Sequence, residues 1–484
     1  MVGHGWLRAV VLFFLFSVSA FAEHANFKVS FPTWLRRQQH QSYLRIQRNI
    51  TSCGAAMAAQ SSHYQKHWVR DSALISLALT RYYIWMRPVE TETPARAQMR
   101  RQRLWSRLET KTRFSSLIQS VGHPDPAIGN GAALYYTDGT PILEEWGHPQ
   151  NDGPALRASA HLTLIAAHPV NEGVPIEGET VSEDTLYAMA KHDAQYVAGN
   201  WSKPSWDLWE ETKGKHFYTL MVQRKSLRDA IHRAELRGDV ELVAGWQQQV
   251  ALIENELRLF WDRDRGYLVQ TRDFVADHAR EFKASNLDVA TVLAVLHTYD
   301  PSDPFFGPLD PQILATVVAL EDTFAPLYPI NGLPAPSEAN GGSPAPVTLG
   351  PAIGRYVEDH WNGFTRGKIA HPWFLATAGF AEFYYQAAKT LLMRPERLND
   401  ISETEFFRRL GCGPNVPDAV RALVKKGDSF LQRVRFHGTG KGELAEQFDR
   451  DTGIQTGPVD LTWSHAAVLT ASIARQELEV SLQN

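Results

Sequence analysis

The chain has 484 residues, 44% hydrophobic and 21% charged, which is typical of a folded globular protein and excludes a disordered or fibrous one. Its formal net charge of -4, with no block of lysine and arginine, argues against nucleic acid as a partner. The 14 tryptophans suit a large core or the apolar faces of sugar rings, and their number alone does not separate these uses.

Residues 1–22 are predicted to form an export signal. A positively charged start, an apolar run from Ala9 to Ser19 and the small-x-small pattern Ala20-Phe21-Ala22 predict cleavage before Glu23. The run is shorter than the roughly 20 residues that a membrane-spanning helix needs, so we expect no stable membrane anchor. The predicted location is secreted or periplasmic.

Six apolar segments with helix-opening starts follow along the chain. A polar residue opens most of them, as is common at helix starts. In chain order, they span about 70–83, 151–167, 217–231, 286–296, 371–388 and 459–475. Amphipathic segments lie between them, for example 102–118, 183–197, 240–261, 311–320 and 417–434, and their charged faces suit the solvent side of a bundle.

This alternation predicts an all-α fold, an (α/α)6 barrel of inner and outer helices, although an irregular array or an α-solenoid gives a similar periodicity. No long Ser/Gly-rich or Pro-rich linker divides the chain, so we expect residues 23–484 to form one domain. In a barrel, the loops that enter the inner helices gather at one end and form a pocket. Those loops carry Arg70, Asp71, Trp146, Asp152, Glu210 and Trp373.

The run Trp206-Asp207-Leu208-Trp209-Glu210-Glu211 places three carboxylates among indoles at a predicted helix edge. An indole beside a carboxylate removes water from it and favours the protonated form, which is how a glycosidase makes a general acid. Taken alone, the run also fits solvated surface charge beside core tryptophans.

Six segments resemble, in order, the signature segments of family 15 glycoside hydrolases, the glucoamylases. They are Tyr64-Gln-Lys-His-Trp-Val-Arg70-Asp71, Trp146-Gly-His-Pro-Gln-Asn-Asp152, Trp206-Asp-Leu-Trp-Glu210-Glu211, Gly354-Arg355-Tyr356-Val-Glu358-Asp359, Pro372-Trp373-Phe374, and Glu446-Gln-Phe-Asp449 followed by Asp460-Leu-Thr-Trp463. Each is weak alone, but the six in order cover nearly all of the chain after the signal. The resemblance implies an (α/α)6 barrel and an inverting exo-hydrolase that releases glucose from the non-reducing ends of α-1,4-glucans, and more slowly cleaves α-1,6 bonds.

The resemblance gives Glu210 the role of general acid and Glu446 that of general base. Inversion needs the two carboxyl groups roughly 6.5–9.5 Å apart, so that a water fits between the base and the sugar. The indole and the carboxylate next to Glu210 in the chain favour its protonated form. Glu446 lies in a polar stretch, where we expect an ionised carboxylate, and Glu443 is the local alternative for the base.

Further residues are implied to bind substrate. Arg70 and Asp71 match a pair that binds the hydroxyls of the terminal glucose, which suits a guanidinium and a carboxylate, although a structural ion pair is the other interpretation. Trp146 matches an indole that lies against the acid and the sugar. The resemblance also implies substrate contacts by Asp207, Glu211, Arg355, Asp359, Trp373 and Trp68, the last of which is equally a candidate core indole.

The chain departs from the family pattern near the expected outer subsites. It inserts Phe364–His371, and it carries His360-Trp361 where the family tends to have a hydroxyl-bearing residue and a tyrosine. These changes affect the expected affinity for longer chains more than the reaction. We expect no separate starch-binding domain, and hence dextrins and maltooligosaccharides as substrates.

Several other expectations follow from the sequence. His-Glu-x-x-His and paired-cysteine motifs are absent, so we expect no metal and no cofactor. We expect a monomer. The functional alternatives are glucodextranase or trehalase activity within the same family pattern, and a non-catalytic carbohydrate-binding barrel.

Overall fold

The structure, a computed structural model, describes residues 25–86, 93–168, 181–276, 283–338 and 345–483. The predicted export signal, residues 1–22, lies outside these ranges. Within them, no helix has the length and apolar character to cross a membrane. The two cysteines of the chain, Cys53 and Cys412, are both free.

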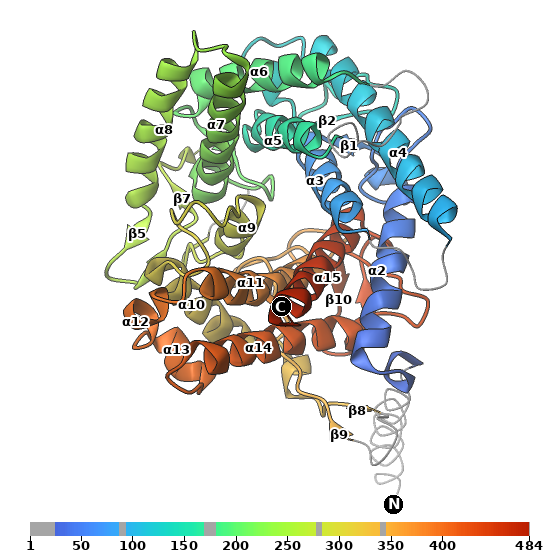
Figure 1. Cartoon of the computed structure of the whole chain (residues 1–484), viewed down its shortest axis with the longest axis vertical. Coiled ribbons are helices and arrows are strands. Elements are labelled where there is room, and N and C mark those ends of the chain that lie inside the picture. Colours follow the sequence, from blue (N-terminus) through green and yellow to red (C-terminus); the bar gives the residue numbers. More distant parts are fainter. Residues whose placement is uncertain (1–24, 87–92, 169–180, 277–282, 339–344, 484) are drawn as a thin grey trace, which may run out of the picture.

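Helices make up most of the described chain and alternate between two layers (Figure 1). The inner helices are α3 (Val69–Trp85), α5 (Asp152–Ala166), α7 (Phe217–Arg237), α9 (Ala290–His297), α11 (Phe374–Met393) and α15 (Thr462–Gln483). The outer helices are α2 (Phe31–Arg48), α4 (Pro94–Val121), α6 (Glu183–Asn200), α8 (Val243–Arg258), α10 (Pro311–Leu327) and α14 (Val416–His437). The short helices α12 (Arg397–Ile401) and α13 (Glu405–Leu410) lie between α11 and α14 in the chain.

The inner helices form a closed ring. Each contacts the next in the order α3, α5, α7, α9, α11 and α15, and α15 contacts α3 again. The outer helices pack one by one on this ring: α2 on α15, α4 on α3, α6 on α5, α8 on α7, α10 on α9 and α14 on α11. The contact between α15 and α3, from opposite ends of the chain, excludes an open solenoid and confirms the predicted (α/α)6 barrel.

Burial of the two layers explains why these sequences take these positions. On the inner helix α11, nearly every residue from Phe374 to Leu391 is buried. The outer helix α14 buries one face, with Leu423 and Leu431 in the core, and exposes Arg421 on the other. A helix that is apolar all round belongs inside a protein, whereas an amphipathic helix covers it.

Short antiparallel strands stiffen the loops between helices. The pairs are β1 (His67–Trp68) with β2 (Leu134–Tyr135), β5 (Trp261–Asp262) with β6 (Tyr267–Leu268), β8 (Ser337–Glu338) with β9 (Ala345–Pro346), and β10 (Gln447–Phe448) with β11 (Gln455–Thr456). A three-stranded sheet contains β3 (Ser205–Trp206), β4 (Lys213–His216) and β7 (Thr271–Arg272). The run 206–211 therefore lies at the β3–β4 hairpin turn, and its predicted position at a helix edge is wrong.

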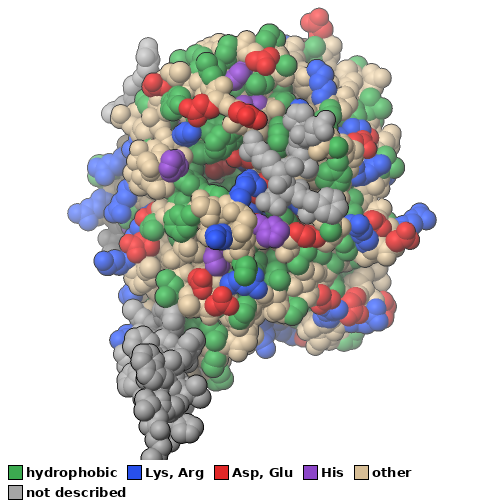
Figure 2. Space-filling model, turned by 180° about the vertical axis from the view of Figure 1, so that it is seen from behind, with side chains coloured by type: hydrophobic (Ala, Val, Ile, Leu, Met, Phe, Trp, Pro, Cys, Tyr) green, Lys and Arg blue, Asp and Glu red, His purple; other side chains and the backbone are tan. Residues whose placement is uncertain are grey.

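The molecule is hollowed near the centre of the face opposite to that of Figure 1. Acidic and basic side chains lie within the hollow, surrounded by hydrophobic and histidine side chains (Figure 2).

Candidate active site

A cavity of about 330 Å³ lies among the loops that enter the inner helices. The predicted site residues that line it are Trp68, Arg70, Asp71, Trp146, Glu210, Glu211, Arg355, Trp373 and Glu446. Four more aromatic side chains line it as well, namely Tyr64, Trp209, Trp361 and Trp463. An aromatic wall with a few convergent charged groups suits a ligand that is apolar on its faces and rich in hydroxyls at its edge, such as a sugar.

Glu210 stands at the tip of the β3–β4 turn in a left-handed backbone conformation, with φ of 64°. A residue other than glycine pays about 1–2 kcal/mol for this conformation, so the surrounding turn must stabilise it. Asp207 does so, because its Oδ1 accepts the backbone N–H groups of Glu211 (2.7 Å) and Thr212 (3.1 Å). The turn therefore directs Glu210 into the cavity.

The contacts of Glu210 all fall on one carboxyl oxygen. Its Oε1 accepts the Trp68 Nε1–H at 2.8 Å and a Gln150 Nε2–H at 3.0 Å, and it lies 3.8 Å from the Arg70 guanidinium. The other oxygen, Oε2, has no hydrogen-bond partner among the described residues and remains available for a proton or a ligand.

The chain neighbours of Glu210 are not its partners, which corrects the expectation from sequence. The Trp209 Nε1–H points to Asp288, at 2.9 Å, instead of to Glu210. The Glu211 carboxylate binds Arg355 and the Tyr356 hydroxyl. Adjacent residues in a tight turn point in different directions, so their order in the chain did not reveal which groups surround the carboxyl of Glu210.

Glu446 is buried, and both of its oxygens accept hydrogen bonds. Trp361 Nε1–H donates to Oε1 at 2.7 Å and the Tyr64 hydroxyl donates to Oε2 at 2.9 Å. Burial raises the pKa of Glu446 to about 7, although the two donors oppose the rise by stabilising the anion. The polar stretch of sequence around Glu446 did not indicate this burial, since the residue is only 2% exposed.

Two adjacent aromatic side chains connect the carboxyl groups. Trp68 contacts Glu210 and Tyr64 contacts Glu446, and the ring centres of Trp68 and Tyr64 lie 6.3 Å apart. The two glutamates therefore line one cavity while each is held by its own donor.

Arg70 and Asp71 form a buried charged pair that is incompletely hydrogen-bonded. Arg70 donates to Gln150 Oε1 (2.7 Å) and to Asp152 Oδ2 (3.1 Å), so its hydrogen-bonded ion-pair partner is Asp152 and not Asp71, with which the structural interpretation paired it. Its Nε lies 3.5 Å from Asp71 Oδ1, and neither atom has a hydrogen-bond partner. Burial, partly offset by Arg70 and reinforced by Glu210, raises the pKa of Asp71 to about 6. These groups can therefore bind a ligand in addition to their structural role.

A sequence profile described as Glycosyl hydrolases family 15 matches residues 34–473. The chain belongs to this family. Glucoamylase 1 of Rhizopus oryzae is 31% identical over 472 residues, which cover 92% of this chain and 72% of that protein. The glucoamylase of Saccharomycopsis fibuligera, solved at atomic resolution, is 27% identical with a TM-score of 0.77 over 93% of this chain and 96% of that one. The protein is therefore a glycoside hydrolase.

Within this family 15 barrel, Arg355 connects two acidic side chains. Its guanidinium binds Glu211 at 2.9 Å and Asp359 at 2.5 and 2.7 Å. Arg366, from the inserted segment, reaches the same oxygen of Glu211 at 3.1 Å. The insertion thus places a second guanidinium beside Glu211, at the cavity wall.

Two predicted substrate ligands do not line the cavity. Asp207 binds backbone N–H groups through Oδ1 and Lys283 through Oδ2 (3.0 Å). Although burial opposes it, Lys283 and the N–H groups lower the pKa of Asp207 to about 2. Asp359 binds Arg355 and the backbone N–H of Trp361. Both aspartates position neighbouring residues of the pocket, and the structure gives neither a direct path to substrate.

Several residues that hold the carboxylates of the pocket in place carry no clear signal in the sequence. Gln150 and Tyr64 lie inside recognised segments, but polar residues of that kind are common and gave no distinct signal. Trp361 stood out only as a departure from the family pattern, yet it donates to Glu446. Lys283 is fully buried between Asp207 and Asp288, with Nζ 3.0 and 2.8 Å from them, and no local motif marks it.

Proposed function

We propose that this family 15 member is an exo-acting, inverting glucoamylase that removes β-D-glucose from the non-reducing ends of dextrins and maltooligosaccharides. It cleaves α-1,4 bonds and, more slowly, α-1,6 bonds. The observation that carries the proposal is the contrast between two glutamates on one cavity: Glu210 has one oxygen without a partner, and Glu446 has both oxygens occupied by donors.

This contrast supports Glu210 as the acid and Glu446 as the base. A protonated carboxyl needs one oxygen for its O–H, and Oε2 of Glu210 is available to donate a proton to the glycosidic oxygen. An ionised carboxylate only accepts hydrogen bonds, which matches the two donors on Glu446. Glu446 therefore takes a proton from the water that attacks the anomeric carbon, and the configuration inverts.

Unpaired polar atoms on the cavity wall support sugar binding. Among the described residues, the indole nitrogens of Trp146 and Trp373 have no hydrogen-bond partner, and neither has Oδ1 of Asp71. Buried polar groups without partners are costly unless a ligand or water satisfies them. We assign Arg70 and Asp71 to the terminal glucose, and Arg355 with Glu211 to the next sugar.

Export and a monomeric state are part of the proposal. A Saccharomyces cerevisiae relative, 28% identical over 93% of this chain, is named an intracellular sporulation-specific glucoamylase, so family membership does not decide the location. N-terminal sequencing of the mature protein tests cleavage before Glu23, and size-exclusion chromatography with light scattering tests the monomer.

Glucose release from maltose, isomaltose and trehalose tests the activity. We expect maltose to be cleaved fastest, and Glu210→Gln and Glu446→Gln each to lose at least about 100-fold in kcat, since general acid–base groups contribute about 10²–10⁴. Glu443→Gln is the matched control in the same loop and should keep its activity. If isomaltose or trehalose is cleaved faster than maltose, the protein is a glucodextranase or a trehalase instead of a glucoamylase. Full activity in both Glu210→Gln and Glu446→Gln would refute the roles assigned to these residues.

A further inference from the structure

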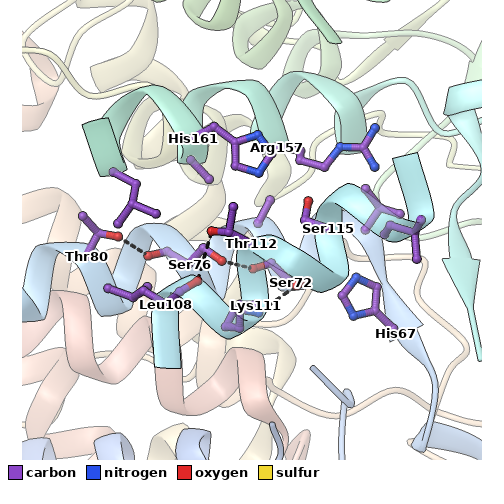
Figure 3. Close-up of a pocket in the computed structure, with 15 residues that line it drawn as sticks. His67, Ser72, Ser76, Thr80, Leu108, Lys111, Thr112, Ser115, Arg157 and His161 are labelled. Carbon is purple, nitrogen blue, oxygen red and sulfur yellow. Dashed lines mark hydrogen bonds between the residues drawn. The ribbon is translucent and has the colours of Figure 1, made fainter. Parts of the chain in front are cut away.

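A second, much smaller cavity lies between α3, α4 and α5 and shares no lining residue with the sugar pocket. Its volume is about 20 Å³, which is room for one species of about the size of a water molecule. Polar side chains from the three helices line it (Figure 3). The titratable residues on its wall are all basic, namely His67, Lys111, Arg157 and His161, and none of the described lining residues is acidic.

Lys111 brings a positive charge to this cavity that no carboxylate among the described residues balances. The side chain is 3% exposed, and its Nζ donates to Ser72 Oγ at 2.8 Å, the one acceptor it has among the described residues. An ammonium has three N–H donors, so this contact leaves two unused. Arg157 differs, because Asp193 pairs with it through two hydrogen bonds of 2.6 and 2.8 Å. A buried charge is costly unless it is paired.

Further donors on the wall have no acceptor within the part of the chain that the structure describes. Ser72 Oγ accepts from Lys111, so its own O–H is available to donate. Nδ1 of His161, a residue that is 4% exposed, has no hydrogen-bond partner. Burial lowers the pKa of His161 to about 4, so the ring is neutral near pH 7 and can donate through one N–H. Burial and Arg107 lower the pKa of Lys111 to about 7, as expected for an amine that lacks a counter-ion.

We propose that this cavity binds a single monovalent anion of halide size, with Lys111 as its counter-charge and the Ser72 hydroxyl and the His161 ring as further donors. One unbalanced positive charge sets the valence, and the volume excludes polyatomic anions such as acetate or sulfate. Ser72 directly follows Asp71 in the first turn of α3. The anion therefore stabilises the start of the helix that carries Arg70 and Asp71 into the sugar pocket.

Halide titration of the full-length mature protein tests the site in solution. Chloride or bromide replaces methanesulfonate at constant ionic strength while Tm is measured. For a chain of this length, a hundredfold excess over Kd raises Tm by about 3 °C. Lys111→Met should lose this response. Lys191→Met, which removes a partly exposed lysine paired with Asp239, is the matched control and should keep it.

Bromide in crystals of the wild-type protein locates the ion directly. We expect an anomalous peak in the cavity, in contact with Lys111 Nζ, and this result does not depend on whether the Lys111→Met variant folds. Absence of the peak, or water alone at Nζ, would overturn the proposal. An equal Tm response to halide in wild type and Lys111→Met would overturn it too.

Discussion

Glu446→Gln should make the protein less active but more stable at high pH. The pKa of Glu446 is raised by burial from an ordinary value of 4.5 to about 7, so the folded state binds this proton more tightly than the unfolded state. The stability that the proton contributes is fully present below about pH 4.5 and is lost as pH rises through about 7. At about 1.4 kcal/mol for each pH unit, the loss amounts to about 3 kcal/mol.

Glutamine has nearly the shape of the protonated carboxyl and does not ionise. Relative to wild type, the free energy of unfolding of Glu446→Gln should therefore increase by about 3 kcal/mol between pH 4 and pH 8. Urea unfolding followed by tryptophan fluorescence measures this difference at each pH. Because both proteins share every other titrating group, their contributions cancel in the comparison.

Glu443→Gln is the control for this measurement. Glu443 lies in the same loop, is 33% exposed at its side chain and contacts Thr439 and Arg45 instead of the cavity. This variant should not reproduce the increase of about 3 kcal/mol expected for Glu446→Gln. If the stability difference between Glu446→Gln and wild type is the same at pH 4 and pH 8, the argument that burial raises the pKa of Glu446 is refuted.

Three other substitutions test the contacts of the pocket. Lys283→Met leaves two buried carboxylates unpaired and should lower the free energy of unfolding by about 3–5 kcal/mol; an unchanged urea midpoint would contradict this. Trp361→Phe removes a donor that stabilises the Glu446 anion. The acidic limb of the pH profile of kcat/KM should therefore move to higher pH. A limb that stays in place or moves to lower pH would argue against Glu446 as the base. Arg366→Ala should raise KM for maltoheptaose several-fold with kcat nearly unchanged, whereas Arg366→Lys should keep most of the affinity. Equal KM values in the wild type and both variants would show that the guanidinium of Arg366 does not bind substrate.

The barrel could be predicted from the sequence because its signal is repeated. Apolar inner segments such as 374–388 and amphipathic outer ones such as 417–434 alternate along the whole chain, and helical periodicity encodes burial directly. Ring closure could not be predicted in the same way, because it depends on a contact between α3 and α15 that no local pattern describes.

The site could be predicted as a set of residues but not as an arrangement. Both glutamates and most of the predicted ligands do line one cavity. Asp207 was expected to contact substrate because its position in the motif does not show that its carboxylate accepts the backbone N–H groups of Glu211 and Thr212. The surroundings of Glu446 were misjudged because Tyr64 and Trp361 come from distant segments. The polarity of the surrounding sequence describes only the residues that are adjacent in the chain. The burial and the pKa of a side chain depend on the residues that surround it in the folded structure.

The central claim is that Glu446 activates water on one face of the sugar while Glu210 protonates the leaving oxygen, with inversion at the anomeric carbon. The most direct test is proton NMR of maltose hydrolysis by the wild-type protein, recorded before the released glucose mutarotates. The proposed arrangement predicts β-glucose as the first product released from the non-reducing end. Initial release of α-glucose would contradict it.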